Sequence, residues 1–341
     1  MSVKPTLKTI ANDLGLSVGT VSRILNNKAK QYRISDETVE LVLKHSHNVG
    51  YFPNLLARSL RHSKSYTIGL MIPDIANPFF AKMAKNIGKE AAAANYTLLL
   101  IDALGSIENE KKQILNMLSR KVDGIVVAPV GTKYDHFNEI KKQNIPLVFI
   151  DRYSSKVDIP HFSSDNFYGA YIATKYFIEN GHKSIALIKG NEEIEVVLDR
   201  RKGYEKALNE ANIQVNKKII LGAEFSIENG YKYTKEILSQ PKPPTAIFAL
   251  SNLIGLGVLQ AVREFNLSIP NDVSLIIFDD QPYVSYLNPP ITTLKQETET
   301  IGNLAFNCLL NIIDDNDYEY TSVKTNPKII VRESVKNLNI R

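Results

Sequence analysis

Residues 6–26 read TLKTIANDLGLSVGTVSRILN, and this stretch decides the amino-terminal fold. Apolar residues recur at helical spacing in its first half, and Thr6 is suited to cap a helix there. Gly15 permits a sharp turn. Ser17 is suited to cap a second helix that runs to Asn26. Two short helices joined by a tight glycine-containing turn predict a helix-turn-helix.

A third helix is expected from Ser35 onward. Val39, Val42 and Leu43 stand there at the spacing of core residues. Helix-turn-helix patterns are loose, so a three-helix bundle that binds no ligand is the alternative interpretation of this region.

Charge is distributed unevenly along the chain. Residues 1–64 hold ten Lys or Arg and four Asp or Glu, a net of +6, whereas the whole chain carries +5. All the excess positive charge therefore lies in the first fifth of the sequence. A basic block on a near-neutral body indicates a polyanionic partner that is met by one end only. From charge alone, a solvated surface is an equally good explanation.

Residues 50–62 read GYFPNLLARSLRH and predict a short hinge helix. Pro53 ends the preceding helix, and Asn54 can cap a new one that runs to Leu60. A helix of this length is unstable alone in water, so it needs a partner. Leucines flanked by arginines suit the DNA minor groove, where a leucine can be pushed between base pairs. The alternative is an ordinary interdomain hinge.

Composition places the chain among ordinary globular proteins. Its 341 residues are 44% hydrophobic and 23% charged, which suggests about two or three domains. The single cysteine, Cys308, excludes an intramolecular disulfide and fits a reducing compartment. The amino terminus has no signal-like apolar region, and no apolar run approaches the ~20 residues of a membrane span. We therefore expect a soluble, cytoplasmic protein without a membrane partner.

The rest of the chain alternates apolar runs with amphipathic stretches. This alternation predicts doubly wound α/β lobes, each with a parallel sheet covered by helices on both faces, and the number of units predicts two such lobes. Ligands of such sheets lie off the carboxyl ends of the strands. The predicted strands are 66–72, 96–101, 124–128, 147–150, 184–188, 246–250 and 273–278, and the predicted helices include 79–94, 108–120, 168–180, 200–211 and 253–265.

Hydrogen-bonding and aromatic residues stand at these strand ends. Taken singly, each of them is better explained as a helix cap or a structural ion pair. Taken together, they predict a ligand cleft that suits a sugar, since rings stack on apolar faces while carboxylates and guanidinium groups bind hydroxyls in pairs. They are Phe79, Phe80, Asp151, Arg152, Arg200, Ser251, Asn252 and Asp279.

Residues 6–26 resemble the DNA-binding headpiece of the lac and galactose repressor (LacI/GalR) family. Residues 50–54 and 57–60 are similar to that family's hinge, and the resemblance runs to the closing VRES at 331–334. It implies a headpiece at 1–49, a hinge at 50–64 and an effector-binding and dimerisation domain at 65–341, built like periplasmic binding proteins. The lobes are expected at about 65–162 with 292–322, and at about 163–291 with 323–341.

The resemblance assigns roles to the DNA-binding residues. Val18, Gly19 and Arg23 match base-reading positions in the major groove, and Arg23 can bond bidentately to guanine. Leu60 matches the family's intercalating leucine, flanked by Arg61. The full predicted set is Thr6, Ser17, Val18, Gly19, Thr20, Ser22, Arg23, Asn26, Tyr51, Asn54, Ala57, Arg58, Leu60 and Arg61, of which Thr20, Ser22 and Asn26 are expected to contact phosphates.

The resemblance also sharpens the effector site. Asp151, Arg200, Asp279 and Gln296 match positions that contact the effector in sugar-responsive members. Ser251-Asn252 stand where many members have Asn-Asp, so the second position keeps its hydrogen-bonding capacity and loses its negative charge. The implied effector is a sugar or sugar phosphate, with a purine or another metabolite as the alternative.

Together these features predict a regulator that binds a pseudo-palindromic operator as a homodimer and responds to a small molecule. Members of the family usually act as repressors. Whether the effector releases the protein from DNA or strengthens its binding stays open. An exported sugar-binding transport protein shares the architecture but lacks the basic headpiece. An enzyme is disfavoured because no Gly-x-Gly-x-x-Gly, phosphate loop or nucleophile elbow is present. No cofactor or metal site is expected.

Overall fold

The computed structural model describes residues 5–26, 28–51, 64–315 and 317–340, and the chain divides into two compact units, Met1–Ser65 and Tyr66–Arg341. The first unit has a small apolar core of Ile10, Val21 and Val42 with their neighbours. Val39 packs against this core as expected, whereas Leu43 is exposed. Its helices are α1 (Leu7–Asp13), α2 (Val18–Leu25), the short 3-10 helix η1 (Lys30–Tyr32) and α3 (Asp36–Asn48).

The predicted caps and turn of the helix-turn-helix are present. Thr6 and Thr9 cap α1 reciprocally, since each backbone N–H donates to the other's hydroxyl. Gly15 has a φ of +64°, a left-handed conformation that lets the chain turn between α1 and α2. The Ser17 hydroxyl accepts a hydrogen bond from the Thr20 backbone N–H at 3.0 Å and begins α2. The predicted motif is therefore confirmed.

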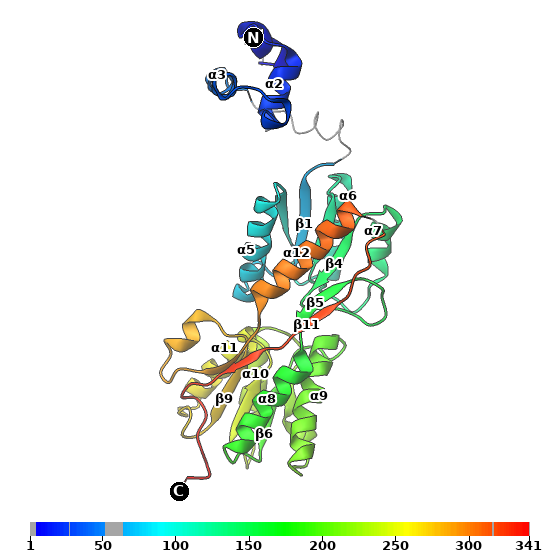
Figure 1. The fold of residues 1–341 in the computed structure, drawn as a ribbon. Coiled ribbons are helices and arrows are strands. Elements are labelled where there is room, and N and C mark those ends of the chain that lie inside the picture. Colours follow the sequence, from blue (N-terminus) through cyan, green and yellow to red (C-terminus); the bar gives the residue numbers. More distant parts are fainter. Residues whose placement is uncertain (1–4, 27, 52–63, 316, 341) are drawn as a thin grey trace. The chain divides into compact units, whose positions relative to one another are not determined.

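The second unit contains two six-stranded sheets, which define its first and second lobes (Figure 1). The first sheet is parallel, in the order β11-β5-β4-β3-β1-β2, and the second has the order β12-β10-β9-β8-β6-β7 with β12 antiparallel to β10. The strands are β1 (Thr67–Ile72), β2 (Thr97–Asp102), β3 (Gly124–Val127), β4 (Leu147–Ile150), β5 (His161–Ser164) and β11 (Val323–Thr325), then β6 (Ile185–Ile188), β7 (Ile220–Leu221), β8 (Ala246–Ala249), β9 (Ser274–Phe278), β10 (Thr292–Lys295) and β12 (Lys328–Ile330).

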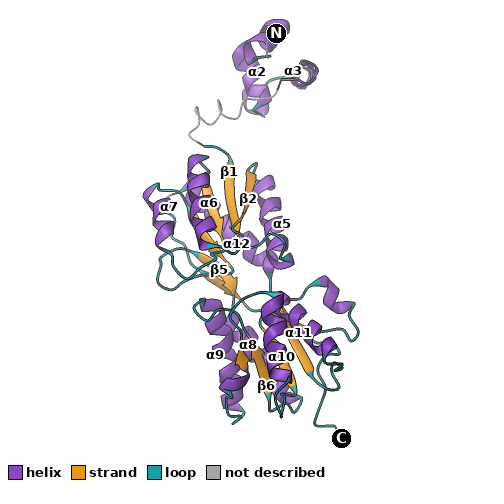
Figure 2. Ribbon diagram, turned by 180° about the vertical axis from the view of Figure 1, so that it is seen from behind, coloured by secondary structure: helices purple, strands orange, loops and turns teal. Residues whose placement is uncertain are grey.

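Helices cover both faces of each sheet (Figure 2). In β1, Leu70 packs toward one face with Ile68, while Met71 packs toward the other with Met117. Strands buried on both faces read as continuous apolar runs, which explains why the sequence reveals them. The helices are α5 (Pro78–Ala93), α6 (Ile107–Ser119), η2 (Asp135–Phe137), α7 (Asn138–Lys142) and α12 (Thr298–Asp314), then α8 (Asn166–Glu179), α9 (Glu195–Glu210), η3 (Lys217–Ile219), α10 (Ile227–Leu238), α11 (Asn252–Glu264) and η4 (Pro282–Ser285).

The chain crosses between the lobes a few residues later than predicted from the sequence. The first crossing is expected near Phe162, but β5 stays in the first sheet to Ser164. The second is expected at Thr292, but β10 belongs to the second sheet. The third is expected at Val323, but β11 belongs to the first sheet. These strands are short and largely polar, so no apolar run marks them.

Helices α8 and α9 approach each other closely at Gly203. A Cβ added there would lie 2.1 Å from the carbonyl oxygen of Phe167. This is a steric clash with a backbone atom, which could be relieved only if one of the two helices moved. Gly88 in α5 is the matched contrast, since its added Cβ would lie 3.5 Å from Leu98 Cδ2, an ordinary contact.

We therefore expect Gly203→Ala to lower the melting temperature by several degrees, because overpacking of this kind costs about 1–3 kcal/mol. Gly88→Ala should leave the melting temperature unchanged or raise it slightly, because alanine is favoured over glycine in helices by ~1 kcal/mol. Thermal unfolding followed by circular dichroism checks both, and equal melting temperatures for the two variants would contradict the close approach.

Candidate functional site

Helix α2 exposes the residues that the sequence assigns to DNA bases. Val18, Gly19 and Arg23 lie on its exposed side, while Val21 and Ile24 are buried in the core. The Arg23 guanidinium carbon lies 3.9 Å from the centre of the Tyr32 ring. This cation–π contact restricts the long side chain without consuming its hydrogen-bond donors. The exposed side of α2 thus presents the small apolar side chain of Val18, the side-chain-free position Gly19 and the oriented guanidinium group of Arg23.

The other predicted DNA-binding residues fall into two groups. Some bond within the headpiece: Ser17 shares a hydrogen bond with the Thr20 hydroxyl at 2.9 Å, and Asn26 Nδ2 donates to the Ser22 carbonyl at 2.6 Å. Thr6 caps α1, and the Tyr51 backbone N–H donates to the Ser46 carbonyl at 2.9 Å. Asn54, Ala57, Arg58, Leu60 and Arg61 lie outside the described residues.

The second unit encloses a small cavity between its lobes, at the carboxyl ends of the strands. Its volume is about 40 Å³, and it adjoins an open cleft of about 620 Å³ with which it shares Asn77, Phe80, Arg152 and Phe225. The lining contains all nine residues of the predicted effector site: Phe79, Phe80, Asp151, Arg152, Arg200, Ser251, Asn252, Asp279 and Gln296.

Two buried aspartates carry the negative charge of the cavity. Asp151 follows β4 and Asp279 follows β9, and both have left-handed backbone conformations, with φ of 60° and 83°. Such conformations are unfavourable for residues other than glycine and cluster at functional sites. Burial raises the pKa of Asp151 to about 6, against the opposing effect of Arg152 and Arg200. Burial raises the pKa of Asp279 as well, opposed first by Arg200.

Two buried arginines balance these carboxylates. Arg200 Nε donates to Asn166 Oδ1 at 2.7 Å, and its Nη1 donates to the Leu250 carbonyl at 2.5 Å. Its guanidinium carbon lies 3.6 Å from the centre of the Phe278 ring. Arg152 Nη1 donates to the carbonyls of Pro129 and Val130 at 3.2 and 3.3 Å. The guanidinium groups are therefore fixed by the protein before any ligand binds.

Side-chain amides complete the lining. Asn252 Nδ2 donates across the cavity to Asn77 Oδ1 at 2.9 Å, which joins α11 of the second lobe to the start of α5 in the first. Gln296 Nε2 donates to Asp279 Oδ1 at 2.5 Å. The carbonyl oxygens Oδ1 of Asn252 and Oε1 of Gln296 are buried without a hydrogen-bond partner among the described residues. Unpaired buried acceptors are costly, so they favour a ligand that donates hydrogen bonds.

One predicted residue uses its polar group elsewhere, and three further residues line the cavity without having been predicted. The Ser251 hydroxyl accepts from the Ile254 backbone N–H at 3.2 Å and caps α11. The cavity lining also includes Asn77, Val196 and Phe225, which were not predicted from the sequence. Asn77 carries a usable signal, because it precedes Pro78 as the cap of α5. Phe225 lies in an irregular segment after β7, where no pattern marks it.

The cavity therefore combines two carboxylates and two guanidinium groups with aromatic walls and unpaired acceptors. Its formal charge sums to zero when all four groups are ionised, which suits a neutral polar ligand. Among the described residues, no three His, Cys, Asp or Glu side chains gather as a metal site would require. None of the helices within the described ranges has the length and apolar character needed to cross a membrane.

Both the headpiece and the two-lobed unit match families of known proteins. Residues 65–333 match the family described as periplasmic binding proteins and sugar binding domain of LacI family, and residues 6–54 match bacterial regulatory proteins of the lacI family. The HTH-type transcriptional repressor PurR of Erwinia tasmaniensis is 34% identical over 338 residues, covering 97% of this chain and 96% of the relative. PurR of Histophilus somni is 31% identical over 334 residues, with 98% and 99% covered.

Solved structures share the fold. A LacI family transcriptional regulator from Enterococcus faecium with bound ribose is 30% identical, with a TM-score of 0.73 over 80% of this chain and 99% of that one. The lac repressor dimer bound to operator and an anti-inducer is 22% identical, with a TM-score of 0.83 over 98% of this chain and 100% of that one, which supports the fold alone. The chain belongs to the LacI family of bacterial regulatory proteins.

Proposed function

We propose that this protein is a transcriptional repressor that binds a pseudo-palindromic operator as a homodimer and is controlled by a neutral monosaccharide. The observation that carries the proposal is the joint presence of an exposed face on α2, with Val18, Gly19 and Arg23, and a charge-balanced cavity between the lobes. The relatives named as PurR repressors support the proposed repression, and the ribose-bound relative supports the proposed sugar ligand.

The cavity chemistry favours a neutral sugar over the other candidates. A sugar phosphate would bring about −1.5 to −2 charges into a site whose own charges already cancel. A sugar hydroxyl can donate to the unpaired Asn252 and Gln296 carbonyl oxygens, and Phe79 and Phe80 offer faces for the ring. A purine also stacks on aromatic rings, and the names of the PurR relatives make it the second candidate.

Control of DNA binding follows if the ligand prefers one arrangement of the lobes. A ligand shifts such an equilibrium only through its different affinity for the two arrangements. Asp151 and Asn77 belong to the first lobe, whereas Arg200, Asn252 and Asp279 belong to the second, so a ligand in this cavity contacts both. A coupling of about 1–3 kcal/mol would change operator affinity about 5–150-fold.

Arg23 is predicted to supply sequence specificity. With a palindromic duplex selected from a random pool by the wild-type protein, Arg23→Ala should weaken binding about 5–150-fold, because a bidentate contact to guanine contributes about 1–3 kcal/mol of discrimination. Binding to random duplex should change much less. Lys44→Ala, which removes an exposed cation from α3, is the control. Fluorescence anisotropy at fixed salt checks this, and an equal loss on both duplexes for Arg23→Ala would contradict base reading.

Neutral sugars are predicted to stabilise the protein. D-Ribose at about one hundred times its Kd should raise the melting temperature by about 5–10 °C, while D-ribose 5-phosphate and guanine should not. Asp279→Asn should reduce the shift. Asp280→Asn is the matched control, because the Asp280 carboxylate bonds to Thr293 and Arg332 instead of the cavity amides. If a panel of neutral pentoses and hexoses gives no shift while guanine does, the ligand class proposed here is wrong.

Sugar affinity is predicted to fall in mild acid. Because burial raises the pKa of Asp151 to about 6, this carboxylate gains a proton below that pH and loses its strength as an acceptor. Folding favours the protonated form, so this residue's contribution to stability is present below its ordinary pKa of 3.8 and is lost as the pH rises through about 6. Calorimetric titration from about pH 7.5 to about pH 5 should show weakening in wild type and a smaller weakening in Asp151→Asn, where Asp279, whose pKa burial also raises, is still present. The same decline in both would contradict this assignment.

A further inference from the structure

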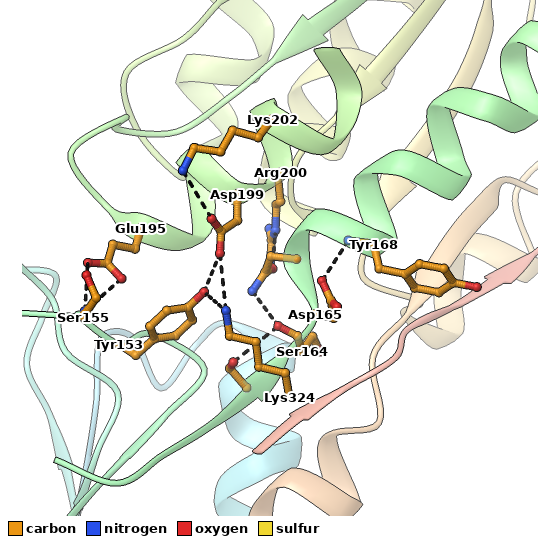
Figure 3. A network of polar contacts seen from close by, with 12 residues as sticks. Tyr153, Ser155, Ser164, Asp165, Tyr168, Glu195, Asp199, Arg200, Lys202 and Lys324 are labelled. Carbon is orange, nitrogen blue, oxygen red and sulfur yellow. Dashed lines mark hydrogen bonds and ion pairs between the residues drawn. The ribbon is translucent and has the colours of Figure 1, made fainter. Parts of the chain in front are cut away.

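A second set of contacts joins the lobes beside the cavity (Figure 3). Tyr153, which follows β4 in the first lobe, donates its hydroxyl to Asp199 Oδ2 of α9 in the second lobe at 2.5 Å. Lys324 of β11 donates to the same Tyr153 oxygen at 2.7 Å and lies 3.6 Å from Asp199 Oδ2. Three polar groups from three segments therefore meet at one point between the lobes.

The tyrosine in this set is held in place by its surroundings. Tyr153 is buried, its ring stacks on His161 with centres 4.5 Å apart, and the Lys324 ammonium lies 4.4 Å from the ring centre. Burial raises the pKa of Tyr153, and the hydrogen bond to Asp199 raises it further. The hydroxyl therefore keeps its proton at neutral pH and stays a donor to the carboxylate, a charge-assisted bond of the stronger kind.

Helix α9 makes a second contact between the lobes, and it also carries a residue that lines the cavity. Glu195, the first residue of α9, accepts hydrogen bonds from the backbone N–H of Ser155 at 2.9 and 3.0 Å. Arg200 follows Asp199 directly and lines the cavity. Successive residues of a helix point in different directions, so α9 can hold the first lobe with Asp199 while it presents Arg200 to the cavity.

The size of the cavity makes these contacts relevant to ligand entry. Ordinary ligand pockets have volumes of ~300–1,000 Å³. The inner cavity of about 40 Å³ is far smaller, so a ligand in the open cleft reaches the four shared lining residues but contacts the whole lining only when the lobes separate.

We propose that Tyr153, Lys324 and Asp199 form a latch that holds the two lobes closed and positions Arg200, whether or not a ligand is bound. None of the three residues lines the cavity, so the latch acts on the closed state without touching the ligand. Any effect of the latch on operator affinity rests on the proposed function, whereas lobe closure itself does not.

Interlobe distances in the full-length protein test the latch directly. Spin labels can be placed at Lys112→Cys in α6 and Glu228→Cys in α10, both exposed and in different lobes, with Cys308→Ala removing the only native thiol. Pulsed electron paramagnetic resonance, without DNA or sugar, should show mainly short distances in this parent. Tyr153→Phe and Lys324→Met should each raise the population at longer distances about tenfold, equivalent to about 1.4 kcal/mol.

The controls separate a latch from a general loss of charge or stability. Lys202→Met removes a cation that lies 3.9 Å from the same Asp199 carboxylate but belongs to α9 itself, so distances should match the parent. Lys324→Arg should restore them. Unchanged distances in both Tyr153→Phe and Lys324→Met, an open parent, or an equal effect of Lys202→Met would overturn the latch. Since no DNA is present, these outcomes leave the proposed repressor function to its own tests.

Discussion

The burial of four charged side chains at the carboxyl ends of parallel strands is the constraint on which the sensor unit depends. Charges removed from water are costly unless they are paired and hydrogen-bonded. Here Asp151 and Asp279 lie with Arg152 and Arg200, and backbone carbonyls and amide side chains fix the arginines and Asp279. Each lobe supplies one aspartate and one arginine, Asp151 with Arg152 in the first and Asp279 with Arg200 in the second, and the charge of Arg200 also acts on Asp151 across the cavity.

This constraint links the cavity to movement of the lobes. The Asn77–Asn252 bond inside the cavity and the Tyr153–Asp199 bond beside it both connect the lobes. A ligand that takes over the hydrogen bonds of Asn252 competes with the first contact and leaves the second in place. The closed state therefore depends on two kinds of contact, one accessible to a ligand and one set by the protein alone.

Much of the fold was predictable because its main strands are buried on both faces and so read as apolar runs, and because Thr6, Gly15 and Ser17 mark the headpiece locally. The edge and crossing strands were not, since β5, β10 and β11 are short and largely polar, and their pairing depends on distant segments. The cavity aspartates could be predicted because each directly follows an apolar strand. Phe225 and the Tyr153–Lys324 contact were not, because only tertiary packing brings them to their positions.

In the proposed function, occupancy of the cavity changes the affinity of the headpiece for DNA. The most direct measurement is the affinity of the purified protein for a selected palindromic duplex, with and without saturating neutral sugar, in wild type and in Asp279→Asn. We expect the sugar to change operator affinity about 5–150-fold in wild type and much less in Asp279→Asn. Equal affinity in wild type with and without every sugar that raises its melting temperature would contradict it.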